Sequence, residues 1–467
     1  MSTPDDRPVP SAEGVSRRSL LTRSASAGVG IVLSGSIPGL FGTAQAKGGG
    51  GVGYGPLVPD PAGLLSLPAG FSYTLVAQSG ATLLESGEPT PDDPDGTAAF
   101  VRRGGNGSVL VNNHEIGGGE AFRVPPLAGL TYDPLAGGGT TNIEVDKDGK
   151  RVREYVSLAG THNNCAGGRT PWDTWLTCEE TEASPAGSSV RHGYVFEVDP
   201  YDQEANRDPQ PIRALGRFAH ESVAVDPRTH TIYLTEDAGS PNGLLYRWTP
   251  PAAALPLGKG ALKALAPDAG TLEAMQAFTK DGAFVPDLSV FTQPGTRLRV
   301  DWLAVPDRDA ATVSTRRQLA QITRSRKLEG MWWGDEGAYF VASFARTTDG
   351  SAAQHDGQVW FVDPDEGRIE LKIWFAYTPA DQDNDPDGPD NITVSPFGGV
   401  ILAEDGDGAS HLVGATDDGE TYFFARNEIA GQSEFTGPTF SNNRKILFAN
   451  VQSPGHVFAI QGPFRKQ

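Results

Sequence analysis

Residues 161–180 read T-H-N-N-C-A-G-G-R-T-P-W-D-T-W-L-T-C-E-E. This stretch holds both cysteines of the chain, Cys165 and Cys178, and it ends in two adjacent glutamates. Residues 174–177 alternate polar and apolar side chains, which predicts a strand that delivers Cys178 and the two acids to its far end. Carboxylates beside a thiolate indicate a metal site. A disulfide between the two cysteines is the alternative in an exported protein.

The same plan recurs along the chain: an apolar strand, a turn, and a second apolar strand that ends in an acid or an amide. Such endings occur at Glu115, Glu179, Glu236, Glu404 and Asn450. Blades of a β-propeller recur at about 40–50 residues when compact, and insertions lengthen them. The high content of Gly, Pro and Phe also favours turns and strands. The sequence therefore predicts an all-β fold, a β-propeller of about six blades, with a helical insertion at residues 257–278.

The first residues carry an export signal. Arg17 and Arg18 form a twin-arginine pattern, and an uncharged apolar run and an A-x-A cleavage site follow. We expect a signal peptide at residues 1–46, a Gly- and Pro-rich lead-in at 47–66 and a single propeller domain at 67–467. No later segment is long enough to span a bilayer. The twin-arginine export machinery would thus deliver the protein, without a stable membrane anchor, to the periplasm or the extracellular space.

The net charge of −20 limits the partners of the protein. Nucleic acids and anionic membranes both require a basic surface, so neither is expected to bind. An acidic protein that acts on an anionic substrate needs local positive charge, which metal ions would supply. We expect a monomer that acts on a small molecule.

A propeller directs the ends of equivalent strands to one central channel, so acids remote in sequence should meet there. The strand endings expected around this cavity are residues 113–115, 178–180, 236–237 and 404–405. So many carboxylates would raise one another's pKa values and destabilise the fold unless cations bind. Carboxylate oxygens favour calcium or ferric iron, and a nearby thiolate indicates a transition metal. The acidic residues 381–390 do not fit an EF-hand. Residues 381–387 are interpreted mainly as a solvated loop, whereas Asp390 and Asn391 open a strand and stay candidates for the site.

These motifs give the chain a resemblance to the PhoX-type alkaline phosphatase family. The stretches that carry it are L-P-x-G-F-S-Y (67–73), P-D-G (94–96), N-N-H-E (112–115), N-C-A-G-G-x-T-P-W-x-T-W-L-T-C-E-E (164–180), G-R-F-x-H-E (216–221), Y-L-T-E-D (233–237), L-E-G-x-W-W (328–333), P-D-N (389–391) and A-E-D (403–405). They cover nearly the whole predicted mature chain. The family's members are propellers exported by the twin-arginine route, with iron and calcium ions at their centre.

The resemblance implies a role for particular residues. Cys165 would be the thiolate ligand of an iron ion. Carboxylate ligands would be Glu221, Glu329 and Glu404, with Asn113, Glu115, Glu179, Glu236, Asp390 and Asn391 as further metal or phosphate contacts. The implied reaction is metal-assisted hydrolysis of phosphate monoesters, in which Lys327, Arg326 and Asn113 stabilise the oxyanions.

One position departs from the family pattern. Members commonly carry arginine two residues before the glutamate of L-E-G-x-W-W, where this chain has Lys327. Lysine is a point charge, whereas arginine offers a planar fork to phosphate oxygens. Two other functions therefore stay open at this point: a lactonase-like metal-dependent propeller hydrolase, and a non-catalytic exported propeller whose ions are structural.

Overall fold

Hydrogen-bonded strands dominate this computed structural model, which describes residues 52–379, 383–431 and 433–467. Contacts within the chain group residues from Ala46 to Gln467 into one compact unit. The predicted signal peptide lies outside the described residues, as does the start of the predicted acidic loop. Within the described ranges, no helix has the length and apolar character needed to cross a membrane.

The strands form five antiparallel sheets. The first contains β4 (Pro94–Val101), β5 (Ser108–His114), β6 (Gly138–Val145) and β7 (Arg151–Thr161), and the second contains β8 (Asn164–Arg169), β9 (Trp175–Glu179) and β10 (Val195–Val198). Another combines β25 (Phe435–Phe440), β26 (Ile446–Val451) and β27 (His456–Gln461) with the early strand β3 (Ser72–Gln78). This last pairing joins the two ends of the described chain in one sheet.

The two remaining sheets are larger. One runs β21 (Pro389–Val394), β22 (Val400–Glu404), β23 (His411–Ala415), β24 (Thr421–Asn427), β2 (Leu65–Pro68) and β1 (Leu57–Val58). The ten-stranded sheet contains β11 (His220–Val225), β12 (Ile232–Glu236), β13 (Leu245–Thr249), β14 (Thr271–Phe278), β15 (Phe284–Val285), β16 (Arg297–Ala304), β17 (Leu328–Trp333), β18 (Ala338–Ala342), β19 (Gly357–Asp363) and β20 (Arg368–Phe375). In it β16 pairs with β14 on one side and with β20 on the other.

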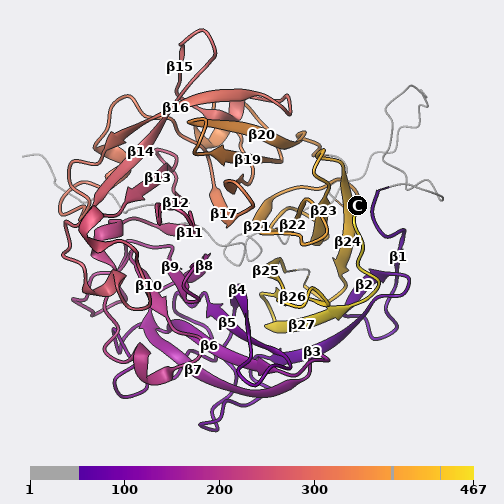
Figure 1. Ribbon diagram of the computed structural model, residues 1–467. Coiled ribbons are helices and arrows are strands. Elements are labelled where there is room, and N and C mark those ends of the chain that lie inside the picture. The colour runs from indigo at the N-terminus through magenta and orange to yellow at the C-terminus, as the bar shows by residue number, and fades with distance from the viewer. Residues whose placement is uncertain (1–51, 380–382, 432) are drawn as a thin grey trace, which may run out of the picture. The chain divides into compact units, whose positions relative to one another are not determined.

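The innermost strands form a closed ring. In order, β4, β8, β11, β17, β21 and β25 each contact the next, and β25 contacts β4 again. Figure 1 shows these strands at the centre, with later strands of each sheet stepping outwards. The predicted all-β, propeller-like arrangement is confirmed. Alternating burial explains the strands: in β20, buried residues such as Ile369 and Leu371 alternate with partly exposed ones such as Glu370.

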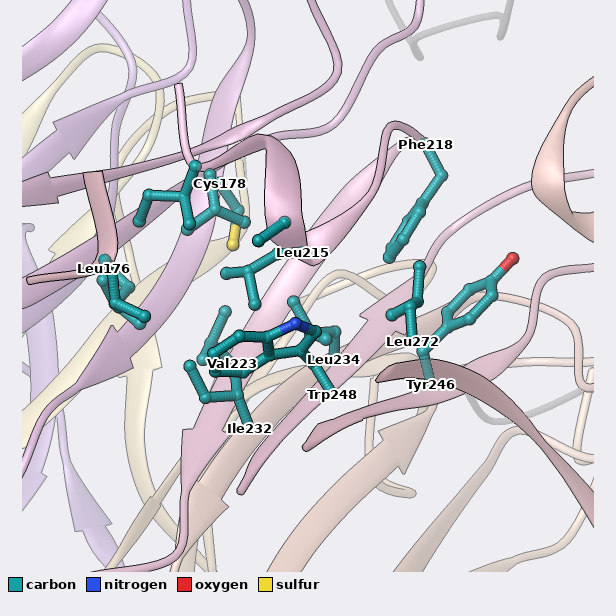
Figure 2. Close-up of a cluster of buried hydrophobic side chains, with 14 of the residues drawn as sticks. Leu176, Cys178, Leu215, Phe218, Val223, Ile232, Leu234, Tyr246, Trp248 and Leu272 are labelled. Atoms are coloured by element: carbon teal, nitrogen blue, oxygen red, sulfur yellow. The ribbon is translucent and has the colours of Figure 1, made fainter. Parts of the chain in front are cut away.

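The sheets pack through apolar faces. Between the sheet of β9 and that of β11 to β13, Leu176, Val223, Ile232 and Trp248 are fully buried in one cluster, drawn in Figure 2. Burial of each such side chain contributes about 1.5–3 kcal/mol. These contacts hold neighbouring sheets in register, and they thereby position the inner strands.

Two expectations about secondary structure were wrong. Residues 257–278 do not form a helical insertion, because this segment holds only a 3-10 turn (Leu262–Ala264) followed by β14. Two glycines and Pro267 interrupt its first half, and its second half alternates in burial as a strand does. The sequence of residues 67–76 also predicts one continuous strand, but the structure divides this segment between β2 and β3, because Gly70 turns the chain with φ of 88°.

Candidate metal centre

A side chain that could bind a metal ion stands at or just before the start of each inner strand. These side chains are Asp95, Cys165, Glu221, Glu329 and Asp390, each the second residue of its strand, and Glu434, which directly precedes β25. Because the six strands form a ring, their starts lie next to one another. Carboxylates and one thiol are therefore gathered at one end of the ring.

A second layer comes from the residue that directly follows the second strand of each hairpin. These residues are Glu115, Glu180, Asp237, Ser343, Asp405 and Gln452. The pairing explains their position, since in each hairpin the last residue of the second strand lies opposite the start of the inner strand, as Glu179 lies opposite Asn164. We call the nine carboxylates of the two layers, with Cys165, the acidic cluster.

The inner strands share an irregularity at this level. In every hairpin the register shifts just after the start of the inner strand, for example between Pro94 and Thr97 and between Leu328 and Met331. Such β-bulges redirect side chains and are common next to active sites. The shift explains how the second residue of each strand comes to face its neighbours around the ring.

The ligand atoms of the acidic cluster lie close together. Within each of four groups, all ligand atoms lie within 4.8 Å of one another. The groups are Cys165–Glu180–Glu221, Glu180–Asp237–Glu329, Glu221–Glu329–Asp390 and Asp390–Asp405–Glu434. Because successive groups share members, they form a continuous line of acids. Gln452 extends it, since its Nε2 donates to Glu115 Oε2 at 2.7 Å and to Asp95 Oδ2 at 3.2 Å.

Close approach of the inner strands depends on glycine. A Cβ atom on Gly96 would lie 2.5 Å from the Cα of Ala166, and one on Gly330 would lie 2.7 Å from the carbonyl oxygen of Asp390. Neither distance is sterically possible without movement of the backbone. These two glycines therefore set how closely the strands, and the acids before them, can converge.

Burial and mutual repulsion dominate the electrostatics of the cluster. Burial, followed by the charges of Glu329 and Glu180, raises the pKa of Glu221 well above its ordinary value. Burial likewise raises the pKa of Asp390 to about 7. The Cys165 thiol has a strongly raised pKa through burial and the nearby carboxylate of Glu221. Without cations the cluster would hold protons in place of charge.

Two basic side chains reach the cluster. Lys327 places Nζ 2.9 Å from Glu329 Oε1 and 3.6 Å from Asp405 Oδ2. Burial alone would lower the pKa of Lys327, but these carboxylates raise it well above its ordinary value. Its backbone has a φ of 45°, which is unusual for a residue other than glycine. Arg326 is directed to Asp237, with 3.3 Å between Nη1 and Oδ1.

Three expected ligands point away from the cluster. Glu179 accepts hydrogen bonds from the backbone of His162 and Gly193, both at 2.9 Å, and from His192 Nδ1 at 2.6 Å. Glu404 accepts from the backbone and ring of His411. Glu236 accepts from the Tyr246 hydroxyl at 2.9 Å and from Arg316 at 3.0 Å.

Successive side chains of a strand face opposite sides, which explains this result. The last residue of β9, β12 and β22 faces away from the centre, and the acid after it faces inwards. Of the residues expected at the centre, the structure brings together Glu115, Glu221, Glu329 and Cys165, whereas the three acids just described face away.

The two expected asparagines support the cluster from outside. Asn113 donates from Nδ2 to the carbonyl oxygens of Cys165 and Ala166, both at 2.8 Å, so it fixes the backbone that carries the thiol. Asn391 donates to Asp390 Oδ1 at 2.9 Å and accepts from the backbone of Gly437 at 2.6 Å. Its amide therefore orients one cluster carboxylate and ties β21 to β25.

Sequence reasoning did not select five of the nine carboxylates of the acidic cluster as ligands. Glu180, Asp237 and Asp405 stand in recognised acidic pairs, and Asp95 stands in a recognised P-D-G turn, but none was selected as a ligand. Choosing the residue after each strand would have found the first three. Glu434 does not follow the second strand of a hairpin. It precedes β25, and only the ring of inner strands brings it next to Asp390 and Asp405.

Comparisons with known proteins agree with this architecture. A family model described as alkaline phosphatase PhoX matches residues 52–153 and 149–455. The chain superposes on Pseudomonas fluorescens PhoX in complex with vanadate, a transition state analogue, with a TM-score of 0.67 and 20% identity, covering 88% of this chain and 97% of that one. It also matches a Xanthomonas campestris gluconolactonase, XC5397, at 13% identity over 88% and 99% of the two chains.

The gluconolactonase likeness has a TM-score of only 0.42, so it supports no conclusion about fold or activity. No match was found among curated proteins. The family model, in contrast, extends over most of the chain and includes every residue of the acidic cluster. The protein therefore belongs to the alkaline phosphatase PhoX family, a family of metal-dependent phosphoric monoester hydrolases.

Proposed function

We propose that the acidic cluster is the site at which this phosphatase binds iron and calcium and hydrolyses phosphate monoesters. The observation that carries the proposal is the convergence of ligand atoms from four inner strands, from Glu434 before β25 and from three second-strand endings. These atoms lie within overlapping groups, each 4.8 Å or less across. Structural acids in a propeller would not need this arrangement, because each could pair with a neighbouring donor as Glu404 does.

The residues present fit metal ions. Asp95 Oδ1 is buried and has no hydrogen-bond partner among the described residues. Buried carboxylates that face other carboxylates need a cation to remain ionised. The group of Cys165, Glu180 and Glu221 combines a thiolate with carboxylates, which suits iron. Asp390, Asp405 and Glu434 offer only oxygen atoms, which suits calcium.

The basic residues have a separate role in this proposal. Bound cations would neutralise the cluster and bind the phosphoryl oxygens of a substrate. Lys327 is held beside the cluster by Glu329 and Asp405, so its ammonium group lies next to the proposed metal site. We infer that Lys327 binds a phosphate oxygen and stabilises the charge that develops on it. Arg326 orients Asp237, and Asn113 fixes the backbone of Cys165.

We also propose the finer features of the molecule. The ten-stranded sheet would be two blades whose outer strands meet through β16, because the ring of inner strands contains two of its members, β11 and β17. With the other four sheets this gives a propeller of six blades. Residues 1–46 would be the twin-arginine signal, 47–66 the lead-in and 67–467 the mature domain, a monomer in the periplasm or outside the cell.

Metal analysis combined with an activity assay tests the function. Protein isolated after export should contain iron and calcium, and it should hydrolyse a simple aryl phosphate but not a sugar lactone. Chelation should abolish the hydrolysis, and readdition of both ions should restore it. Hydrolysis that survives removal of all metal would contradict the proposal, as would metal-loaded protein that cleaves only the lactone. The exposed carboxylate of Glu366 provides a control, since Glu366→Gln should change neither metal content nor rate.

A further inference from the structure

A second cavity lies at the other end of the inner strands. Its volume is about 710 Å³. The strands run from the acidic cluster towards it: β17 passes from Glu329, its second residue, to Trp332 and Trp333, and β21 passes from Asp390 to Thr393. Between the two ends lies a narrow space of only about 20 Å³, lined by Gly96, Gly330 and larger residues such as Trp175. The cavity is therefore separate from the metal centre.

One wall of this cavity is aromatic. Trp332 on β17 lies opposite Tyr339 on β18, which lies opposite Phe361 on β19, so the three rings form a ladder across the sheet. The ring centroids of Tyr339 and Phe361 are 4.9 Å apart. All three side chains are partly exposed and line the cavity. Gly337 makes room for the ladder, because a Cβ atom there would meet the Phe361 ring at 2.6 Å.

Acids are close to the aromatic wall. Asp335, in the turn between β17 and β18, and Asp417, in the turn between β23 and β24, are exposed residues that line the cavity. Burial raises the pKa of Tyr339, and the charges of Asp417 and Asp335 raise it further, so the potential at this ring is negative. Glu336 contributes a third acid to the lining.

Two basic residues also line the cavity. Arg169 is paired with Asp173, with 2.6 Å between Nη2 and Oδ1, and its guanidinium lies over the Phe100 ring. Arg444 is an exposed residue in the turn between β25 and β26. The acids of the lining thus outnumber its bases, and the acid-rich part adjoins the aromatic ladder.

Buried hydroxyl groups complete the lining. Thr393 and Thr439 are only 1% and 2% exposed, and both line the cavity. Neither hydroxyl makes a hydrogen bond with another residue in the described ranges. Because both residues line the cavity, these hydroxyls are available to a group that enters it.

We propose that this cavity binds an alkylammonium ion that carries a hydrogen-bonding group. The faces of Trp332, Tyr339 and Phe361 attract cations through the negative charge of their π-systems, and this attraction is strongest in a partly desolvated site. Asp335 and Asp417 add charge of the right sign. The hydroxyls of Thr393 and Thr439 bind the polar group of the ligand. The proposal is independent of the metal centre, and a phosphate-like anion does not fit the aromatic, acid-rich wall.

Calorimetric titration of the full-length protein tests the proposal with a matched pair of probes. Choline has the required charge and hydroxyl, and 3,3-dimethyl-1-butanol has nearly the same shape without the charge. Choline should bind at least about tenfold more tightly than the neutral alcohol, which is the effect of a cation over aromatic rings. Equal affinity for both probes, or no binding of choline, would overturn the proposal. So would binding of glucose in place of choline.

Variants locate the binding. Tyr339→Leu and Phe361→Leu keep an apolar side chain but lose the π-face, so each should weaken choline binding about tenfold. Asp335→Asn, in an exposed turn, should weaken it two- to threefold and will fold even if a ring variant does not. Phe278→Leu is the matched control, because Phe278 also forms a cross-strand ring pair, with Phe284, away from the cavity. If choline binding survives Tyr339→Leu, Phe361→Leu and Asp335→Asn, the site is not this cavity.

Discussion

Two sets of buried acids in this protein differ by one position in the sequence. Glu179, Glu236 and Glu404 end their strands and face away from the centre, whereas Glu180, Asp237 and Asp405 follow directly and belong to the acidic cluster. The first set accepts hydrogen bonds from backbone amides, a tyrosine hydroxyl or an arginine. The second set faces other carboxylates. We refer to them as the outer and the inner acids.

The difference shows that burial of an acid does not by itself indicate a functional site. The outer acids are at least as buried as the inner ones, but donors surround them, so their role is to stabilise the ends of the strands. The inner acids belong to groups of carboxylates, where bound cations would balance their charge. The partners of a carboxylate therefore indicate its role.

The largest expected effect is on metal binding and catalysis, and it should distinguish Glu180 from its neighbour Glu179. Glu180→Gln removes a ligand that belongs to two of the four groups, so we expect loss of bound metal and a fall in kcat of about 10³-fold or more. Metal content and hydrolysis of an aryl phosphate by the same sample measure both effects. Full metal occupancy with normal turnover in Glu180→Gln would remove the distinction between inner and outer acids.

The neighbouring substitution should affect stability instead. Glu179→Gln replaces a carboxylate oxygen, which accepts from backbone amides, with an amide group that repels these donors. We expect a loss of about 3 kcal/mol in the free energy of unfolding, because at least one buried donor is left without a partner. Denaturation in urea measures this loss. The folded variant should bind metal as the parent does, and metal loss without destabilisation would reverse the two roles.

Substitution of Lys327 tests whether a positive charge beside the inner acids contributes to phosphate binding and turnover. Lys327→Ala should lower kcat/KM about 10²-fold without loss of metal, because the ammonium group stabilises charge on the phosphate. Lys327→Arg should keep or raise activity, since a guanidinium fork fits phosphate oxygens. Arg316→Ala removes the cation of an outer acid, Glu236, and should lower stability with little effect on kcat/KM. Equal activity of the alanine, lysine and arginine forms would exclude a role for residue 327 in phosphate binding.

The sequence was sufficient for the strands and for the principle of convergence. Alternating polar and apolar residues and repeated strand endings predicted the propeller-like arrangement. The family resemblance implied Cys165, Glu221 and Glu329 as ligands, and the structure places all three in one cluster. The sequence could not reveal which of two adjacent acids faces inwards. That depends on the residue at which pairing ends and on the β-bulge at the start of each inner strand, and both are set by contacts with the neighbouring strand.

After removal of metal, substitution of the inner and of the outer acid of one pair should change the melting temperature in opposite directions. In chelated protein, burial and the charges of Glu115, Asp237 and Glu329 disfavour an ionised Glu180 more than Lys327 stabilises it. Glu180→Gln should therefore raise the melting temperature relative to the chelated parent. Glu179→Gln should lower it under the same conditions, because its donors are part of the protein itself. We expect about 1–2 kcal/mol of stabilisation from the first change. A lower melting temperature for both variants would mean that Glu180 has stabilising partners other than metal ions.

The smallest expected effect concerns the two cysteines. Like the inner and outer acids, one cysteine lies in the acidic cluster and the other lies outside it. Both are free thiols, so the structure contains no disulfide between them. Cys165 lies with Glu180 and Glu221 in the acidic cluster, whereas Cys178 is fully buried among apolar side chains including Leu176 and Val223.

Removal of the Cys178 sulfur leaves only a small cavity, so Cys178→Ala should lower the free energy of unfolding by about 1 kcal/mol and leave iron content unchanged. Cys165→Ala should instead remove iron while the fold persists. Because both thiols are buried, their loss is comparable in packing, and a difference in iron content then reports ligation. Equal loss of iron in both variants would indicate that the acidic cluster extends to Cys178, and equal retention would assign the thiolate of Cys165 to packing alone.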